Sequence, residues 1–208
     1  MITESELVKK VRTLLNEAEE DSVSLITDDT LVLDRHISAL LPEAVLFVQM
    51  NKVQGVLNPK TIADCPVVDA GDGGVVLQLP DDYIRLISLK LDSWKRPCTK
   101  SYPVGSVVAA LQSDKYLRTG NFSPVSVEGV DAAGHLTLAL YPSGSSPIVD
   151  SFVYEARYNA STGIAGGDDS LIKAVAYQCA ALLCNVYEKH DTANVFQSLA
   201  AALCNNEK

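Results

Sequence analysis

Apolar residues recur at helical spacing near the N-terminal end of the chain. Thr3 followed by Glu6 is a capping-box pattern. The apolar positions that follow keep the helical period: Leu7, Val8, Val11, Leu14, Leu15 and Ala18. A second helix is predicted over residues 31–50, with Asp28-Asp29-Thr30 as its cap. Pro42 removes a backbone donor from the middle of that helix and clashes with the preceding turn, so we expect a kink or a break there.

Two further helices are predicted at the C-terminal end. Asp168-Asp169-Ser170 can cap a helix over residues 171–189, which is apolar on nearly every side and rich in alanine. His190-Asp-Thr is the predicted turn, and the last helix has one apolar face, formed by Val195, Phe196, Leu199, Ala202 and Leu203. A helix that is apolar all round is normally enclosed by other elements, so this hairpin should supply much of the core.

Between the two ends, apolar and polar residues alternate as they do in strands with one buried face. The predicted strands cover residues 65–70, 75–79, 86–91, 125–127, 136–140 and 152–158, and the last three should be antiparallel. Ser106 to Arg118 is predicted to be one short helix. Gly71-Asp-Gly-Gly is interpreted as a turn, because a strand follows it and the Lys-Ser/Thr pair of a phosphate-binding loop does not.

The stretch from Leu77 to Cys98 has the clearest local signals. Pro80 should end the strand at Leu79, and Asp81-Asp82 can cap one helical turn. Asp92-Ser93 then predicts a tight turn between the strand over 86–91 and a returning strand that starts at Trp94-Lys95-Arg96-Pro97. A hairpin of this kind would carry a basic and aromatic tip.

These elements predict an α+β fold in which a helical bundle of N- and C-terminal helices carries an inserted antiparallel β-rich region. Residues 1–55 should form the N-terminal helices of the bundle. Residues 56–165 should form the β-rich insertion with one short helix. Residues 166–208 should form the C-terminal helical hairpin that completes the bundle.

Composition narrows the function classes. The 208 residues are 47% hydrophobic and 21% charged, which is enough for a packed core, and the net charge of −9 disfavours a general nucleic-acid-binding surface. The five cysteines are odd in number and lack Cys-x-x-Cys spacing, so we expect neither a disulfide framework nor a zinc site. Cys179, Cys184 and Cys204 fit small buried groups in a reducing cytoplasm. Neither a signal peptide nor a membrane span is expected.

Few residues point to chemistry. The pairs Asp28-Asp29, Asp81-Asp82 and Asp168-Asp169 each precede a predicted helical turn, where capping explains them. His36, His135 and His190 lack the spacing of a metal site or a triad, and no nucleophile motif is present. We therefore expect no catalytic residue, cofactor or metal ion, and a protein that is not an enzyme.

One cluster, Trp94 with Lys95 and Arg96, looks exposed, aromatic and basic. Two interpretations of it stay open. Trp94 packs on the sheet as part of the core, or the three residues form a contact with a neighbouring protein, where Trp and Arg are common anchors.

Several stretches together resemble one known family. They are the capped N-terminal helix, the Ala/Val-rich second helix over Ile37–Val48, Leu79-Pro-Asp-Asp-Tyr-Ile-Arg-Leu-Ile-Ser-Leu-Lys-Leu, Trp94-Lys-Arg-Pro, Gln112-Ser-Asp-Lys-Tyr-Leu-Arg-Thr-Gly, the Leu-Ala-Leu-Tyr-Pro strand that ends at Pro142, and the C-terminal helical hairpin. Together these stretches span nearly the whole chain. In them the chain resembles the head-to-tail connector, or adaptor ring, proteins of short-tailed bacteriophages, including those of tailed gut phages.

The resemblance implies a structural virion protein, made in the cytoplasm of the bacterial host and located in the head-tail connector. Such proteins form homo-oligomeric rings, commonly dodecamers, that bind the portal protein and a further tail or ring protein. Double-stranded DNA passes through the ring without tight binding, and no membrane is involved. The residues alone also permit a non-enzymatic binding module on a helical bundle that recognises a protein or a small ligand. Self-assembly distinguishes the two functions, because a ring protein should assemble alone or on a portal, whereas a binding module can be monomeric.

Overall fold

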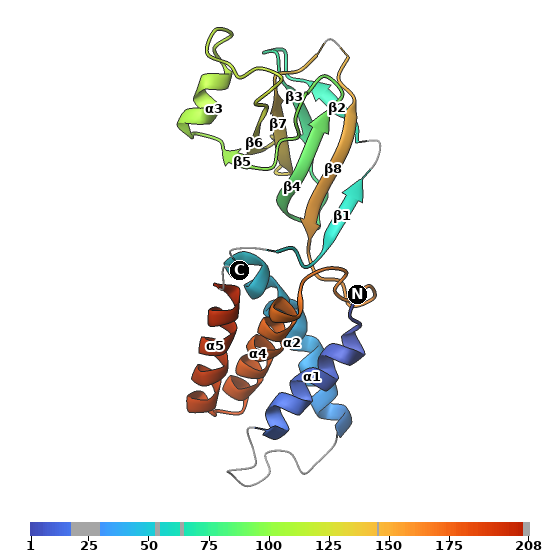
Figure 1. Cartoon of the computed structure of the whole chain (residues 1–208), viewed down its shortest axis with the longest axis vertical. Coiled ribbons are helices and arrows are strands. Elements are labelled where there is room, and N and C mark those ends of the chain that lie inside the picture. The colour runs from blue at the N-terminus through green and yellow to red at the C-terminus, as the bar shows by residue number, and fades with distance from the viewer. Residues whose placement is uncertain (18–29, 53–54, 63–64, 145, 206–208) are drawn as a thin grey trace. The chain divides into compact units, whose positions relative to one another are not determined.

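The computed structural model describes residues 1–17, 30–52, 55–62, 65–144 and 146–205. The chain divides into two compact units (Figure 1). Residues 1–58 and 157–208 form the helical unit, and residues 59–156 form the β unit. The sequence places these two boundaries at 55/56 and 165/166. The described residues contain both helices and antiparallel sheets, which confirms the mixed α+β class.

The helical unit contains α1 (Glu4–Glu17), α2 (Thr30–Asn51), α4 (Asp169–Val186) and α5 (His190–Cys204). The helix α4 contacts each of the other three, and Figure 1 shows it between α5 and the pair α1 and α2. Residues on several sides of α4 are buried, among them Val175, Cys179 and Ala181. The expectation that this helix is enclosed on most sides is therefore confirmed, and Cys184 and Cys204 are buried as well.

Two of the predicted caps are present. The Thr3 backbone N–H donates to the Glu6 carboxylate over 2.8 Å, and the Glu6 N–H donates to Thr3 Oγ1 over 3.3 Å, which completes the capping box of α1. Asp168 Oδ1 accepts the N–H of Leu171 at 3.0 Å and caps α4. The pair Asp28-Asp29 lies outside the described residues.

A backbone bridge between Ile2 and Ile164 joins the N-terminal end of the chain to the segment before α4. Each residue donates its N–H to the other's carbonyl oxygen, over 2.9 and 3.0 Å. Gly163 has a φ of +65°, and a Cβ there would lie 2.3 Å from the Ile2 carbonyl oxygen. Only glycine permits this close approach, which ties the start of α1 to the segment that leads into α4.

Two expectations about the helices are corrected. The helix α2 continues through Pro42, which lies on its exposed side, so of the two predicted alternatives, a kink or a break, the break does not occur. His190 is the first residue of α5 and not part of the turn. The turn instead uses Tyr187, Glu188 and Lys189, with Glu188 at a φ of +59°.

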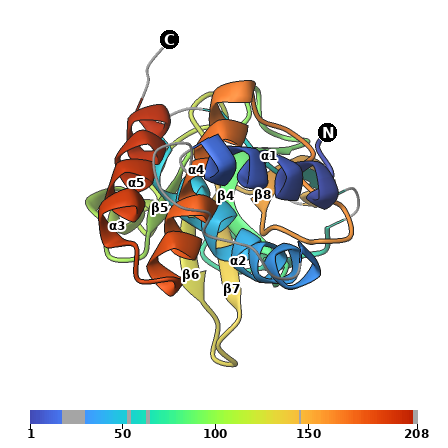
Figure 2. The same ribbon diagram turned by 90° about the horizontal axis from the view of Figure 1, so that it is seen from below.

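The β unit contains two sheets. One has the order β1 (Pro59–Ile62), β8 (Val149–Ala156), β4 (Tyr83–Leu91). The other has the order β2 (Val67–Asp69), β3 (Val75–Gln78), β7 (Leu136–Tyr141), β6 (Val125–Val130), β5 (Ser101–Pro103). All pairs are antiparallel except β5 with β6, and Figure 2 shows the hairpin of β6 and β7.

The two sheets share one apolar core. Leu138 and Leu140 of β7 meet Leu89 of β4 and Phe152 of β8 in it. The opposite face of the five-stranded sheet carries a smaller cluster around Val127 and Tyr141, against which α3 (Val107–Gln112) packs Val108 and Ala109. Because neighbouring residues of a strand point to opposite faces, both sides of this sheet are covered at these positions.

Three predictions in the β unit are only partly right. The strand β8 does not continue the hairpin of β6 and β7, because it pairs with β1 and β4 in the other sheet. The helix predicted over Ser106 to Arg118 ends at Gln112. Turns follow it, in which the Asp114 carbonyl oxygen accepts the backbone N–H groups of Leu117 and Arg118. Asp81-Asp82 lies in a hydrogen-bonded turn closed by Tyr83 and Pro80, not in a capped helical turn.

Candidate functional surfaces

Trp94 follows the turn at the end of β4. Its N–H donates to the Leu91 carbonyl oxygen over 3.0 Å, which closes the predicted tight turn at Asp92-Ser93. The side chain then enters the shared core with only 2% of its surface exposed, and its indole N–H donates to the Pro142 carbonyl oxygen over 2.7 Å. The interpretation of Trp94 as an exposed anchor is therefore wrong, and its interpretation as a core residue is confirmed.

Lys95 and Arg96 are exposed, as the sequence predicts. The returning segment does not form a strand, because it pairs with β4 only at the bridge between Cys98 and Leu89. The Lys95 N–H instead donates to the Asn121 carbonyl oxygen over 2.9 Å. The backbone of Lys95 therefore lies beside the segment that follows α3, a contact that the linear sequence does not indicate.

Ionisable groups of the β unit form small hydrogen-bonded sets. Lys60 Nζ and the Tyr154 hydroxyl donate to the two oxygens of Asp82 over 2.7 and 2.8 Å. Burial opposes ionisation of Asp82, but these two donors outweigh it and lower its pKa. The Tyr141 hydroxyl donates to Asp72 over 2.9 Å, and burial together with this bond raises the Tyr141 pKa to about 12. Each set joins strands or turns of the β unit, which is a structural role.

The histidines and the possible metal ligands are the remaining candidates for chemistry among the described residues. His36, His135 and His190 are exposed, and each lies near one neighbouring polar group: Tyr187, Asp131 and Asn185. Among the described residues, no group of three or more His, Cys, Asp or Glu side chains is placed to hold a metal ion.

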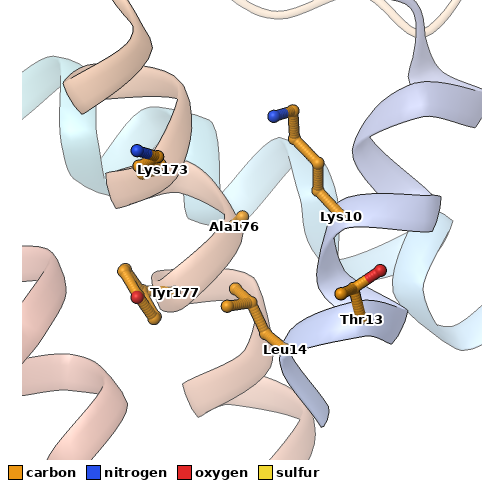
Figure 3. Close-up of a pocket in the computed structure, with 6 residues that line it drawn as sticks. All are labelled: Lys10, Thr13, Leu14, Lys173, Ala176 and Tyr177. Atoms are coloured by element: carbon orange, nitrogen blue, oxygen red, sulfur yellow. The ribbon is translucent and has the colours of Figure 1, made fainter. Parts of the chain in front are cut away.

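A hollow of about 320 Å³ lies between α1 and α4 in the helical unit (Figure 3). Figure 3 shows Lys10 on α1 and Lys173 on α4, with Tyr177 and Leu14 further along the two helices. Thr13 and Ala176 complete the lining. Lys173 Nζ donates a hydrogen bond to the Asp169 carboxylate over 2.9 Å. This bond raises the pKa of Lys173 and keeps its amine protonated. The hollow therefore has an apolar floor and two cationic side chains.

Sequence reasoning did not find this hollow. Its residues come from two helices that lie more than 150 positions apart in the sequence, and neither helix alone indicates a hollow. The available signal was a lysine on each of two helices that were predicted to belong to one bundle.

Comparison with known proteins adds no assignment, since no protein-family model matches the chain and no curated protein sequence is significantly similar to it. In the described part of the chain, no helix combines the length and the hydropathy needed to cross a membrane.

Proposed function

We propose that the protein is a structural component of a virion, in which copies of the chain form a ring between the portal and the tail of a short-tailed bacteriophage. DNA passes through the ring. The observation that carries the proposal is the order of the elements, in which two helices from each end of the chain share one core and a complete β unit is inserted between them. In this proposal the four helices act as a bundle, and the β unit is inserted between α2 and α4 along the chain.

The composition of α5 supports a protein that contacts other copies of itself. No residue from Thr192 to Asn205 is charged. The inner face of α5, with Phe196 and Ala200, is buried, yet Val195 and Leu199 are exposed on its outer side. A solvent-facing helix normally carries charged side chains on its outer side, so this face is suited to packing against another protein surface.

The net charge of −9 also fits a conduit. Each Lys or Arg that pairs with a phosphate adds salt-dependent affinity, which would hold DNA in place. A lumen with few such pairs lets the duplex slide. We therefore expect the assembled protein to bind DNA no more tightly than about 1 μM at physiological salt.

The test is to measure the mass of the purified full-length chain by mass photometry, and its shape by negative-stain microscopy, with and without a portal protein of the same phage. The proposal expects rings, either of the chain alone or on the portal. A chain that stays monomeric in both conditions refutes it. Submicromolar DNA binding in a filter assay at physiological salt would refute the passive conduit.

A second function is favoured by the hollow between α1 and α4. An apolar floor with Lys10 at its edge fits an anionic group attached to an apolar body, so the chain could act as a non-enzymatic binding module for a protein or a small ligand. A monomer that loses binding of such a ligand in the Lys10→Ala variant would support this function over the ring.

A further inference from the structure

The segment from Val104 to Phe122, which includes α3, exposes an unusual amount of apolar surface. Val104 is 74% exposed and Tyr116 is 83% exposed. A third of the large hydrophobic side chains that are exposed in the described residues lie in this one segment: Val104, Val107, Leu111, Tyr116, Leu117 and Phe122. Isolated exposed apolar residues are ordinary, but a concentration of them marks an interaction surface.

The short helix α3 is apolar on two opposite sides. Val108 and Ala109 pack against the cluster around Val127 and Tyr141 in the β unit. Val107 and Leu111, one turn apart, face away from that cluster and are exposed. The inner side is what attaches α3 to the sheet, so the outer side has no role in the fold of the β unit.

The same region is basic in an acidic protein. Residues 95–122 contain five basic residues and one acidic residue, whereas the rest of the chain contains 12 basic and 25 acidic residues. None of the five basic residues takes part in the ion pairs found among the described residues. The five are Lys95, Arg96, Lys100, Lys115 and Arg118. Arg118 instead donates to the carbonyl oxygens of Gln112 and Asp72 and lies 5.5 Å from the centre of the Tyr141 ring. The other four cations are exposed, so their charge is available to a partner.

Two contacts bring basic residues next to this apolar segment. The hydrogen bond from Lys95 N–H to the Asn121 carbonyl oxygen joins the backbone of the exposed pair Lys95 and Arg96 to the residue that precedes Phe122. Lys115 Nζ lies 4.8 Å from the centre of the Tyr116 ring. We call this surface, formed by residues 95–96 and 104–122, the α3 patch.

We infer that the α3 patch binds the acidic surface of a second copy of this chain, in a head-to-tail contact. This inference rests on the proposed ring and names the surface through which the copies join. Two α3 patches would repel each other because both are positive, so a symmetric dimer through this surface is disfavoured. The rest of each copy is strongly negative, which makes the chain complementary to itself only in the heterologous arrangement that closes rings.

The aliphatic members of the patch favour a protein partner over DNA. Tyr116 and Phe122 could stack on bases, but Val104, Val107 and Leu111 have no flat face to offer a base. Aliphatic and aromatic side chains surrounded by cations are instead suited to an acidic protein surface that has apolar side chains of its own.

The experiment compares two variants of the full-length chain with matched controls. Lys95→Glu with Arg96→Glu reverses the charge of the patch, and Lys9→Glu with Arg35→Glu makes the same change in net charge on α1 and α2. Leu111→Ser with Tyr116→Ser removes apolar surface from the patch, and the matched control is Val130→Ser with Leu136→Ser on the exposed part of the β6 and β7 hairpin. All eight side chains are exposed, so the melting temperatures should stay close to that of the unchanged chain.

Sedimentation velocity at low and high salt should show that each patch variant weakens self-association by about tenfold or more, while the controls change it by less than about twofold. Salt should weaken self-association of the unchanged chain and have little effect on the charge-reversed variant. The charge-reversed variant keeps its acidic surface, so it should still bind one unchanged copy and stop further growth. A symmetric interface would not allow that mixed species.

The possible failures are distinguishable. If the chain forms rings and both patch variants assemble normally, the inference is wrong and the proposed function stands. If the unchanged chain is monomeric at every concentration, alone and with the portal, the proposed function fails and the inference fails with it. If a monomer binds DNA through Lys95 and Arg96, the patch is a nucleic-acid surface and the inference is overturned.

Discussion

Replacing Trp94 tests the placement of the best-defined side chain in the β unit. The indole is 2% exposed and lies in the core between the two sheets. Truncation of a buried Trp to Ala typically costs about 3–5 kcal/mol. Here it also removes the donor to the Pro142 carbonyl oxygen, a bond worth about 0.5–1.5 kcal/mol. We therefore expect Trp94→Ala to lower the free energy of unfolding by at least 3 kcal/mol, about the low end of that range.

Two further variants separate the contributions. Trp94→Phe keeps an aromatic ring but loses the indole N–H, so its cost should lie below that of Trp94→Ala. Arg96→Ala changes an exposed side chain two positions away and should change the free energy of unfolding by less than about 0.5 kcal/mol. Arg96→Ala serves as the matched control for local sequence change.

The assay is urea unfolding of the full-length chain followed by far-UV circular dichroism, which does not depend on the tryptophan. The slope of the transition should be unchanged, so that a shift in midpoint reports stability. In the unchanged chain, Trp94 is the only tryptophan, and its fluorescence reports the β unit specifically. If Trp94→Ala unfolds at the same midpoint as the unchanged chain, the side chain is not in the core and the placement described above is wrong.

Three other predictions concern packing, capping and pH. Ala180→Leu adds volume to the fully buried side of α4 and should cost about 1–3 kcal/mol in urea unfolding, whereas Ala202→Leu on the exposed side of α5 should be nearly neutral; equal effects would contradict the enclosed α4. Asp168→Ala removes the cap of α4 and should cost about 0.5–2 kcal/mol, and Asp169→Ala, which breaks only an exposed ion pair, should cost less when both are compared by thermal melting. The fold raises the pKa of several tyrosines, because it favours their neutral form. The free energy of unfolding should therefore be highest below about pH 10, the pKa of tyrosine in the unfolded chain, and should fall as the pH rises above it. Urea midpoints at pH 8 and pH 11 together with a titration of phenolate absorbance check this, and an unchanged midpoint would count against the burial of these hydroxyls: Tyr83, Tyr141, Tyr154 and Tyr158.

Local patterns were sufficient for the elements whose residues interact with near neighbours in the chain. The capping box of Thr3 and Glu6 spans three residues, so its geometry follows once a helix starts there. The burial of α4 was readable because a helix that is apolar all round has no side that favours water. The α+β class and the insertion of strands between helical pairs follow from the change of period along the chain.

The direction in which Trp94 points depended on a distant residue. A turn at Asp92-Ser93 is compatible with an indole that faces solvent or the core, and the sequence left both open. The choice is made by the Pro142 carbonyl oxygen, which accepts the indole N–H, and by the second sheet, which supplies the apolar surface around the ring. Likewise, β8 alternates like its neighbours in sequence but pairs with β1 and β4, because alternation defines a buried face and not a partner strand.

The two candidate surfaces also needed the tertiary structure. The hollow brings Lys10 and Lys173 together only because α1 packs against α4. The α3 patch exists because Val108 and Ala109 attach one side of α3 to the sheet and leave Val107 and Leu111 outside. From sequence all four residues count as apolar positions of one helix, and which of them face the core is set by the sheet on which the helix rests. Sequence alone determined the net charge and the concentration of basic residues between positions 95 and 122. The fold decided which apolar side chains near these cations are exposed, because it attaches one side of α3 to the sheet.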